Sequence, residues 1–455
     1  MSPRVSFARL SGWRNPKSIP GYLLKPYDAT IDYLYGLQSR GIKFGLRNVL
    51  RLLNYVGNPH RAFPSVHIAG TNGKGSTASF IASILMESGY RTALYTSPHL
   101  VRFTERIRID GKEIPEGRLV EYVRLLRPAI EETGATFFES TTCAAFMYFA
   151  DEEVDIAVLE TGLGGRLDAT NVVLPEVSVI TTIGMDHMEY LGNTLRSVSR
   201  EKGGIIKRGV PVVTSSREPV VVGVLRAIAG RKHSPFYRAA GVVSLSSARA
   251  SDGLLKMRSR AFGAVRVRLG LGGPHQAENA RLAVAALGIL KRRRGGARRP
   301  GLITRDAIRR GLRNVRENTG LRGRLEIVRS RLCLDVAHNP DGIRVLLRAL
   351  GVRGRRPRVV VFGAMKDKDW KAMLCELHGA FDRCILVAPR VARAASVGTL
   401  LRRARALGMN AAGATSVASG VRLARGAAGP RGSIVVTGSH YVVGEALASL
   451  NRRYT

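Results

Sequence analysis

Residues 67–77 read HIAGTNGKGST, a short apolar run that breaks into a glycine-rich turn with one lysine and ends in two hydroxyl residues. The preceding residues Val66–Ala69 are typical of a buried β-strand. Three glycines leave the backbone of the turn free of side chains: Gly70, Gly73 and Gly75. Backbone N–H groups of such a turn can converge on phosphate oxygens, and Lys74 adds a full positive charge. The stretch therefore predicts a phosphate-binding turn between a strand and a helix.

The residues after the turn predict a helix that begins near Ser76 and stops at Gly89. Its apolar positions are expected on one face: Ala78, Ile81, Ala82, Ile84 and Leu85. The helix N-terminus would add partial positive charge beside the phosphate. The motif differs from a regular Walker A sequence, which needs glycine in place of Ile68 and a hydroxyl residue directly after the lysine. A plain glycine-rich turn is the alternative, but it gives no reason for the lysine and the hydroxyls.

GTNGKGS resembles the nucleotide loop of the Mur ligase superfamily, whose members make amide bonds by ATP-driven activation of a carboxylate. Eight further motifs follow in the order expected of folylpolyglutamate synthase/dihydrofolate synthase: SPHLVRFTERIRIDG (97–111), LETGLGGRLDATN (159–171), GMDHMEYLG (184–192), REKGGIIK (200–207), GPHQAENA (273–280), GRLE (323–326), DVAHNPDG (335–342) and TGSHYVVGE (437–445). The resemblance covers the chain from about Tyr27 onward. Eight ordered motifs are far more specific than any one of them.

Length and composition are typical of an ordinary multi-domain globular protein. The chain has 455 residues, of which 45% are hydrophobic, and no run of 18 apolar residues occurs. The first residues, MSPRVSFARLSGWRNP, carry positive charge without an apolar stretch after it, so we expect neither a secretory signal nor a membrane span. We expect a cytoplasmic protein.

The chain has four cysteines: Cys143, Cys333, Cys375 and Cys384. They form no CxxC pair, which argues against a zinc site or a disulfide framework.

The net charge of +38 raises the question of nucleic-acid binding. Basic residues are spread along the whole chain, with peaks at 291–299 and 353–358 and no interleaved aromatic residues. We therefore interpret them as solvated basic loops, and expect no nucleic-acid partner.

Only 13 of the 72 basic residues are lysine. A lysine is therefore mildly informative in this chain, and Lys366, Lys368 and Lys371 cluster after a predicted strand.

The order of predicted elements indicates an α/β protein of two domains. Helices are expected at 27–37 and 46–55, which leaves about 65 residues before the phosphate turn, too few for the extra N-terminal domain of cell-wall Mur ligases. β-type runs follow at 92–95, 155–159 and 177–183, and residues 210–272 hold a possible small antiparallel sheet. After helices at 279–290 and 304–313, a second series of β-type runs is expected at 332–336, 358–362, 384–387 and 433–437.

We place the domain boundary near Thr319–Leu321. The prediction is a P-loop ATPase domain with a mostly parallel sheet at 1–319, followed by a smaller Rossmann-like C-terminal domain at 320–455 that carries the glutamate-ligase function. Two domains imply a hinge near Gly320.

The resemblance implies the residues that hold the nucleotide. The loop residues would contact the phosphates: Gly70, Thr71, Asn72, Gly73, Lys74, Gly75 and Ser76. Arg324 would reach the phosphates from the domain boundary, and Asn279 with Gln276 would contact the adenine. For Asn279, a capping role at the nearby helix is the alternative.

The resemblance also implies two Mg²⁺ sites. Glu160 and Ser97 would hold one ion, and Glu160 and His187 the second. Both Glu160 and His187 follow β-type runs, so they are expected at the carboxyl edge of the parallel sheet. A structural hydrogen-bonding histidine is the alternative for His187, since Mg²⁺ prefers oxygen ligands.

Lys202 is implied to be a further metal-side residue that is carbamylated. Addition of CO₂ to a neutral amine converts a cation into an anion with two oxygens, and it requires a lysine whose pKa is lowered by burial or by cationic neighbours. Arginine cannot react in this way. A solvated lysine is the alternative.

In the second domain, Asp335 and His338 are implied to face the γ-phosphate and the incoming glutamate. An Asx-type turn before a helix at Pro340 is the alternative for this segment. The run TFFESTT (136–142) and the loop after Ser97 are expected to line the pterin side.

Together these features predict a monomeric, ATP- and Mg²⁺-dependent ligase that joins L-glutamate to a folate-type carboxylate, with Lys74, Lys202, Asp335 and His338 as its catalytic residues. Two alternatives remain open. One is a Mur-type amino-acid ligase that acts on a non-folate pterin or another acid. The other is a basic P-loop ATPase that binds nucleic acid.

Overall fold

The computed structural model describes residues 26–41, 43, 45–247, 254–293, 302–328, 331–351 and 356–451. The strands are β1 Ser65–Ala69, β2 Thr92–Tyr95, β3 Ile107–Ile109, β4 Lys112–Glu113, β5 Ile156–Glu160, β6 Val177–Ile180, β7 Val212–Thr214, β8 Phe236–Arg238, β9 Val243–Ser247, β10 Leu254–Ser259, β11 Gly263–Arg268, β12 Glu326–Val328, β13 Leu332–Leu334, β14 Arg358–Phe362, β15 Arg383–Leu386, β16 Ala411–Gly413 and β17 Ser433–Thr437.

The helices are α1 Pro26–Gly36, α2 Arg47–Tyr55, α3 Lys74–Glu87, α4 Glu116–Thr133, α5 Phe137–Asp151, α6 Met188–Leu191, α7 Leu195–Gly203, α8 Pro219–Arg231, α9 Ala239–Val242, α10 His275–Arg293, α11 Arg305–Arg313, α12 Val315–Thr319, α13 Pro340–Leu350, α14 Trp370–Leu377, α15 Val397–Ala406, α16 Val417–Ala428 and α17 His440–Asn451. Short 3-10 turns lie at Leu37–Arg40, Pro59–Arg61, Phe103–Arg106 and Ala169–Val172. None of the helices in the described ranges has the length and apolar character needed to cross a membrane.

The first sheet has eight strands in the order β4-β3-β2-β5-β1-β6-β7-β8. Strands β2, β5, β1, β6, β7 and β8 run parallel, and β3 and β4 extend one edge in antiparallel fashion. The phosphate turn follows β1, which is an inner strand. The carboxyl ends of β2, β5, β1 and β6 therefore meet at one edge of the sheet, where ligands of parallel sheets collect.

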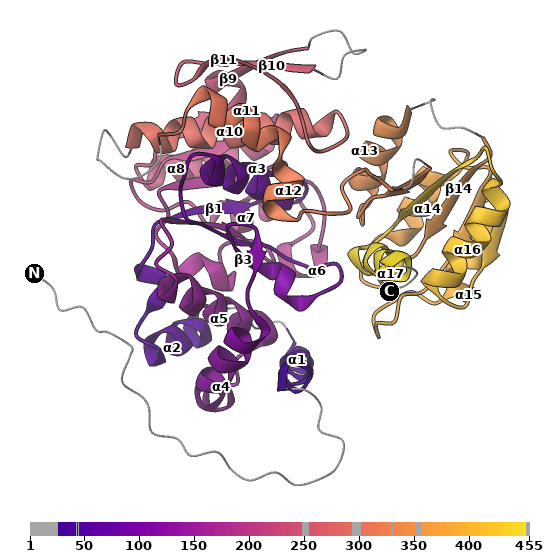
Figure 1. The fold of residues 1–455 in the computed structure, drawn as a ribbon, viewed down its shortest axis with the longest axis horizontal. Coiled ribbons are helices and arrows are strands. Elements are labelled where there is room, and N and C mark those ends of the chain that lie inside the picture. The colour runs from indigo at the N-terminus through magenta and orange to yellow at the C-terminus, as the bar shows by residue number, and fades with distance from the viewer. Residues whose placement is uncertain are drawn as a thin grey trace, which may run out of the picture.

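Side chains of successive strand residues pack on opposite faces of this sheet. On β5, Ile156 and Val158 join one hydrophobic cluster with α3 and α10, whereas Ala157 and Leu159 join another with α4 and α5. Figure 1 shows these two layers of helices on either side of the strands. Burial on both faces explains why the strands are short continuous apolar runs.

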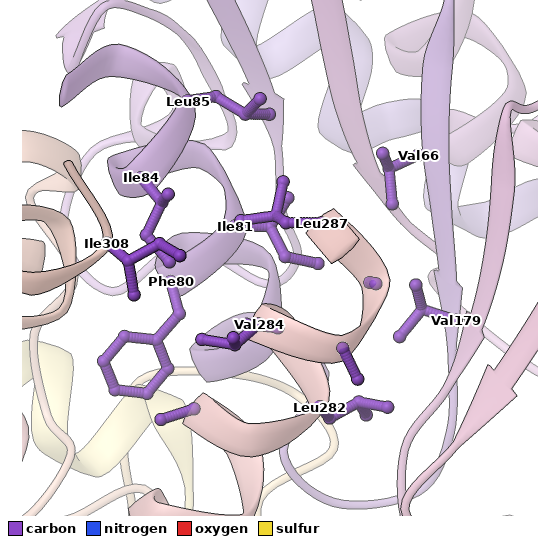
Figure 2. Packing of buried hydrophobic residues seen from close by; sticks show 14 of the residues in the cluster. Val66, Phe80, Ile81, Ile84, Leu85, Val179, Leu282, Val284, Leu287 and Ile308 are labelled. Atoms are coloured by element: carbon purple, nitrogen blue, oxygen red, sulfur yellow. The ribbon is translucent and has the colours of Figure 1, made fainter. Parts of the chain in front are cut away.

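Helix α3 is more buried than the sequence pattern predicts. The helix begins at Lys74, not near Ser76, and every residue from Gly75 to Leu85 is buried. The predicted apolar positions are buried, and so are the polar positions between them, because α3 contacts strands β1, β2 and β5 as well as helices α10, α11 and α12. Figure 2 shows Ile81 beside Leu287 and Ile84 beside Ile308 in this packing. The polar side chains are accommodated by bonds such as that from Ser83 Oγ to the Gly311 carbonyl, 2.7 Å.

The antiparallel sheet predicted within residues 210–272 is confirmed as β11-β10-β9. The strand predicted at 177–183 is shorter and ends at Ile180. Residues beyond it leave the ladder because they pair with the phosphate turn, where Thr71 N–H donates to the Thr182 carbonyl at 2.8 Å.

A second lobe contains the six-stranded sheet β12-β13-β17-β14-β15-β16 and helices α13–α17 (Figure 1). Strands β13–β17 are parallel, and β12 adds an antiparallel edge. The predicted class, an α/β protein with a mostly parallel first sheet and a separate C-terminal sheet, is confirmed. The basic peaks at 291–299 and 353–358 lie largely outside the described residues.

Candidate active site

The phosphate turn is packed against its neighbours through its glycines. Gly70 has φ +153°, and a Cβ there would lie 1.8 Å from Thr181 Oγ1. Gly73 has φ +88°, a left-handed conformation that favours glycine, and a Cβ there would lie 2.5 Å from Asn279 Oδ1. The turn therefore requires glycine at both positions, because it packs closely against Thr181 and Asn279.

Lys74 and Glu160 face each other at the mouth of the turn. Lys74 Nζ lies 3.9 Å from Glu160 Oε1, and the carboxylate side chain is only 5% exposed. Ser97 N–H donates to Glu160 Oε2 at 3.2 Å. Burial raises the pKa of Glu160, against the lowering effect of Lys74. This carboxylate is incompletely compensated and is suited to bind a cation.

Lys202 lies beneath the phosphate turn. Its Nζ donates to the Gly70 carbonyl at 2.8 Å, and the side chain is buried. Burial, followed by the nearby charge of Lys74, lowers the pKa of Lys202 to about 7. The solvated-lysine alternative is therefore wrong.

A cluster of charged and polar side chains joins the two lobes beside the turn. Asp186 and His187 follow β6, and Lys368 follows β14 in the second lobe. Lys368 Nζ lies 2.7 Å from Asp186 Oδ1 and 2.7 Å from His187 Nε2. Asn339 of the second lobe donates to Asp186 Oδ2 at 3.3 Å and to Asn72 Oδ1 of the phosphate turn at 3.2 Å. The cluster therefore ties the second lobe directly to the nucleotide loop.

His338 lies at the edge of the same cluster. Its Nδ1 lies 2.9 Å from the Val336 carbonyl and must donate to it, so Nε2 is left to face Asp186 Oδ2 at 3.8 Å. Burial lowers the pKa of His338 to about 4, so the ring is neutral at pH 7. The ring centroid of His440 lies 5.2 Å away.

Asp335 accepts backbone hydrogen bonds from Leu325 at 2.8 Å and Ala337 at 2.9 Å. Helix α13 is instead capped by Asn339, whose side chain accepts from Gly342 N–H. The Asx-turn alternative is thus correct for the local bonding of Asp335, although Asp335 does not cap the helix. Arg324 is partly buried, and desolvation lowers the pKa of its guanidinium, whereas the charges of Asp335 and Glu160 act to raise it.

The two residues that the resemblance implies for adenine contact, Gln276 and Asn279, lie on the first turns of α10. Asn279 donates to Gln276 Oε1 at 3.0 Å, and Gln276 donates to Ser76 Oγ at 3.3 Å. Because α10 begins at His275, Asn279 is inside the helix. The capping alternative for Asn279 is wrong, and its side chain is directed at the phosphate turn.

An aromatic cluster forms where the sequence predicts the pterin side. The rings of Tyr35 and Phe137 stack with centroids 5.8 Å apart. The buried guanidinium of Arg106 lies 5.3 Å from the Phe137 ring centroid and donates to His99 Nδ1 at 2.8 Å. Figure 1 shows α1 and α5, which carry the two rings, in the same part of the larger lobe.

The donor set fits a divalent cation that shares its shell with other ligands. Among the described residues no three His, Cys, Asp or Glu side chains are grouped so that they could hold a metal alone. Glu160, the Ser97 hydroxyl and His187 could each supply one ligand, and nucleotide phosphates and water would complete the shell, as Mg²⁺ commonly requires. Ligands of one ion need not contact each other directly, so the second predicted set, Glu160 with His187, stays a prediction.

Sequence reasoning singled out neither Asp186 nor Asn339 as site residues. Asp186 lies within the quoted motif GMDHMEYLG beside His187, and its carboxylate after a buried strand was a usable signal. Asn339 was read only as part of a turn. Lys368 was noted for its rarity as a lysine but received no role.

Two family models match the chain. The model described as Mur ligase middle domain matches residues 68–287, and the model described as Mur ligase, glutamate ligase domain matches residues 323–440. The Bacillus subtilis dihydrofolate synthase/folylpolyglutamate synthase is 37% identical over 364 residues, which is 77% of this chain and 83% of that protein. The Escherichia coli dihydrofolate synthase/folylpolyglutamate synthase is 33% identical over 432 residues, 94% of this chain and 96% of that protein.

Solved structures agree with these relatives. E. coli FolC in complex with DHPP and ADP superposes with a TM-score of 0.83 at 31% identity, covering 95% of this chain and 99% of that chain. Mycobacterium tuberculosis folylpolyglutamate synthase complexed with ADP gives a TM-score of 0.84 at 32% identity, covering 94% and 99%. With 37% and 33% identity to two such enzymes over most of its length, the chain belongs to the folylpolyglutamate synthase/dihydrofolate synthase family of Mur ligases.

Proposed function

We propose that the protein is an ATP-dependent ligase that adds L-glutamate to a folate-type carboxylate, as a dihydrofolate synthase, a folylpolyglutamate synthase or both. The observation that carries the proposal is the contact between Asn72 in the phosphate turn and Asn339 in the second lobe. It brings Asp335 and His338, on the same loop as Asn339, to the nucleotide turn. The comparisons favour this function over the nucleic-acid alternative, because both family models describe ligase domains.

The chemistry requires activation because a carboxylate is a poor electrophile. Transfer of the ATP γ-phosphoryl group to the carboxylate gives an acyl phosphate, which the amine of glutamate attacks with loss of phosphate. In this proposal Lys74 and the backbone amides of Gly73–Ser76 hold the β and γ phosphates, and Arg324 adds positive charge opposite them. Asn279 and Gln276 contact the adenine.

Glu160, Ser97 and His187 are proposed to hold Mg²⁺. When bound, the ion neutralises charge on the phosphates and on the developing acyl phosphate. Glu160 suits this role because its buried charge has only a long ion pair with Lys74, 3.9 Å, and a backbone hydrogen bond from Ser97, 3.2 Å.

Lys202 is proposed to carry a carbamate. Its neutral amine would attack CO₂, forming an N–C bond and releasing one proton, and the product anion would lie on the metal side of the phosphate turn. The pKa of about 7, lowered chiefly by burial, supports this step because much of the amine is neutral at physiological pH.

The substrate side is proposed from the second lobe and the aromatic cluster. His338, neutral and with Nε2 free to accept a proton, is placed to receive the amine of the incoming glutamate, and Asp335 orients this loop through its backbone bonds. The stacked rings of Tyr35 and Phe137 suit one edge of a pterin.

We place the domains at 1–319 and 320–455; the monomeric state and the cytoplasmic location stay predictions.

Lys74→Ala tests the nucleotide site directly. It should abolish ligation and leave the melting temperature unchanged, because the side chain faces the phosphate position and not the core. Lys366→Ala is the matched control, since Lys366 is exposed and its Nζ donates to the Ala392 carbonyl at 3.1 Å. Wild-type turnover by the Lys74 variant would refute the assignment of the phosphate turn.

A further inference from the structure

The side chain of Lys368 crosses from the second lobe into the larger lobe. Lys368 lies between β14 and α14, and its ammonium contacts Asp186 Oδ1 and His187 Nε2, each at 2.7 Å. The side chains of Lys368 and Asp186 are only 8% and 9% exposed. A buried ion pair of this kind holds its two partners strongly, since removal of one leaves the other charge uncompensated.

The contact defines the protonation of His187. An ammonium group has three donors and no acceptor, so Nε2 of His187 must supply its lone pair. His187 also has a left-handed backbone conformation, with φ +50°, directly before α6. Lys368 therefore occupies the lone pair of Nε2 through which His187 would bind a metal ion.

The Lys368 ammonium also compensates the negative charge of Asp186. One oxygen of its carboxylate accepts a hydrogen bond from the Lys368 ammonium at 2.7 Å. Its second oxygen accepts from Asn339, which also contacts Asn72 of the phosphate turn. A substitution of Lys368 would therefore also affect the nucleotide loop and the contact between the two lobes.

We propose that the Lys368 ammonium is a resident cation that competes with a divalent metal ion for Asp186 and His187. One lone pair cannot bind two cations. An ammonium group and a metal ion that both contacted Nε2 of His187 would also repel each other strongly, because little water screens the site. Lys368 must withdraw before a metal can bind His187, which makes it a positioning residue. The inference rests on the proposed function for the metal role of His187.

The competition has a consequence for the order of binding. A metal ion alone gains few ligands from the protein and must displace a buried ion pair. A metal ion that arrives with nucleotide brings phosphate oxygens as further ligands. Lys368 therefore suppresses binding of free metal and favours entry of the metal together with the nucleotide.

Binding of Mn²⁺ alone, measured by the electron paramagnetic resonance signal of free Mn²⁺, tests this on the full chain without nucleotide. Lys368→Met keeps the length of the side chain and removes its charge, so Mn²⁺ affinity should rise about tenfold. Lys366→Met removes the same charge from an exposed position two residues away and should change affinity by less than about twofold. Adding His187→Ala to Lys368→Met should remove the gain. Unchanged or weaker Mn²⁺ binding by Lys368→Met contradicts the proposal.

A second measurement uses the wild-type protein, in case Lys368→Met folds poorly. Acetic anhydride labelling followed by mass spectrometry reports the accessibility of each lysine amine. At a Mn²⁺ concentration that saturates the protein by the resonance signal, Lys368 should be labelled several-fold faster than without Mn²⁺, and Lys366 equally in both. Equal or slower labelling of Lys368 overturns the proposal.

Neither the Mn²⁺-binding measurement nor the labelling measurement depends on ligase activity. A protein that shows the exchange but makes no glutamyl product would refute the proposed function alone. An active ligase whose Lys368→Met variant gains no Mn²⁺ affinity would refute only the exchange.

Discussion

The amine of Lys202 donates a 2.8 Å hydrogen bond to the carbonyl oxygen of Gly70, the first residue of the phosphate turn. A lysine from α7 is thus held directly behind the loop that is proposed to bind ATP. Burial, followed by the charge of Lys74, lowers the pKa of Lys202 to about 7. About half of the amine is neutral at that pH, and the neutral form is the one that reacts with CO₂.

Lys202→Arg should be as inactive as Lys202→Ala, with turnover reduced by about 100-fold or more. Arginine keeps the charge but cannot form a carbamate. Lys207→Arg is the matched control and should stay active: Lys207 lies in the loop that follows the end of α7, is partly buried, and donates to the Asn171 carbonyl. Carbon-13 NMR with labelled bicarbonate should give a carbamate signal in the wild type that Lys202→Ala lacks. An active enzyme with unmodified Lys202, together with near-normal turnover of Lys202→Arg, would refute the carbamate.

His338→Ala should impair amide formation and spare nucleotide binding. The ring lies in the second lobe beside Asp186, not on the phosphate turn. We expect ADP affinity within about threefold of wild type and a large fall in kcat, whereas His378→Ala, at an exposed position, should change neither. A His338 variant that loses ADP affinity but turns over normally at saturation would show that the role is misassigned.

Gly70→Ala should destabilise the fold by about 3 kcal/mol or more, because its Cβ would overlap Thr181 Oγ1. Gly89→Ala is the matched control for backbone strain. Gly89 has φ +81° and nothing within 4 Å of a Cβ, so we expect a cost of about 1 kcal/mol. Urea unfolding measures both variants. Equal losses of stability would mean that the close approach at Gly70 is relieved by movement of Thr181.

His67 should make the protein less stable in acid. Its ring is fully buried with Nδ1 unpaired, and burial, followed by the charge of Lys207, lowers its pKa from 6.5 to about 3. The unfolded chain therefore binds a proton that the folded one does not between these values. Stability from this group is complete above pH 6.5 and is lost as the pH falls toward 3, by up to about 1.4 kcal/mol per pH unit.

His67→Gln does not titrate in this range. Its unfolding free energy should fall less steeply than that of the wild type between pH 6.5 and 4. Parallel curves for the two proteins would show that other groups account for the acid sensitivity.

Local sequence patterns predicted the elements whose two ends are marked by neighbouring residues. Strands β2, β14 and β17 begin and end where the sequence predicts, because each is a continuous apolar run between polar residues. The end of β6 was predicted three residues too late, because its last residues pair with the phosphate turn. The full burial of α3 was missed because its cover includes Gly311, 228 residues from its contact Ser83.

The site followed the same division. The phosphate turn and the residues at strand ends were identified from motifs, since their chemistry is visible within a few residues. The contact between Asp186 and Lys368 joins residues 182 positions apart and depends on how the two lobes meet. No local pattern carries that information, although the scarcity of lysine in this chain drew attention to one of the two partners.

The protein is proposed to join glutamate to a folate-type acid through an acyl phosphate. The most direct measurement supplies dihydropteroate and tetrahydrofolate separately, each with isotopically labelled oxygen in the accepting carboxylate, together with ATP, Mg²⁺ and L-glutamate. Mass spectrometry should find a glutamylated product from at least one acid and one labelled oxygen transferred to the released phosphate, because the carboxylate oxygen leaves with phosphorus. Absence of glutamyl product from both acids would contradict the proposed function, and product without label in the phosphate would contradict the acyl phosphate.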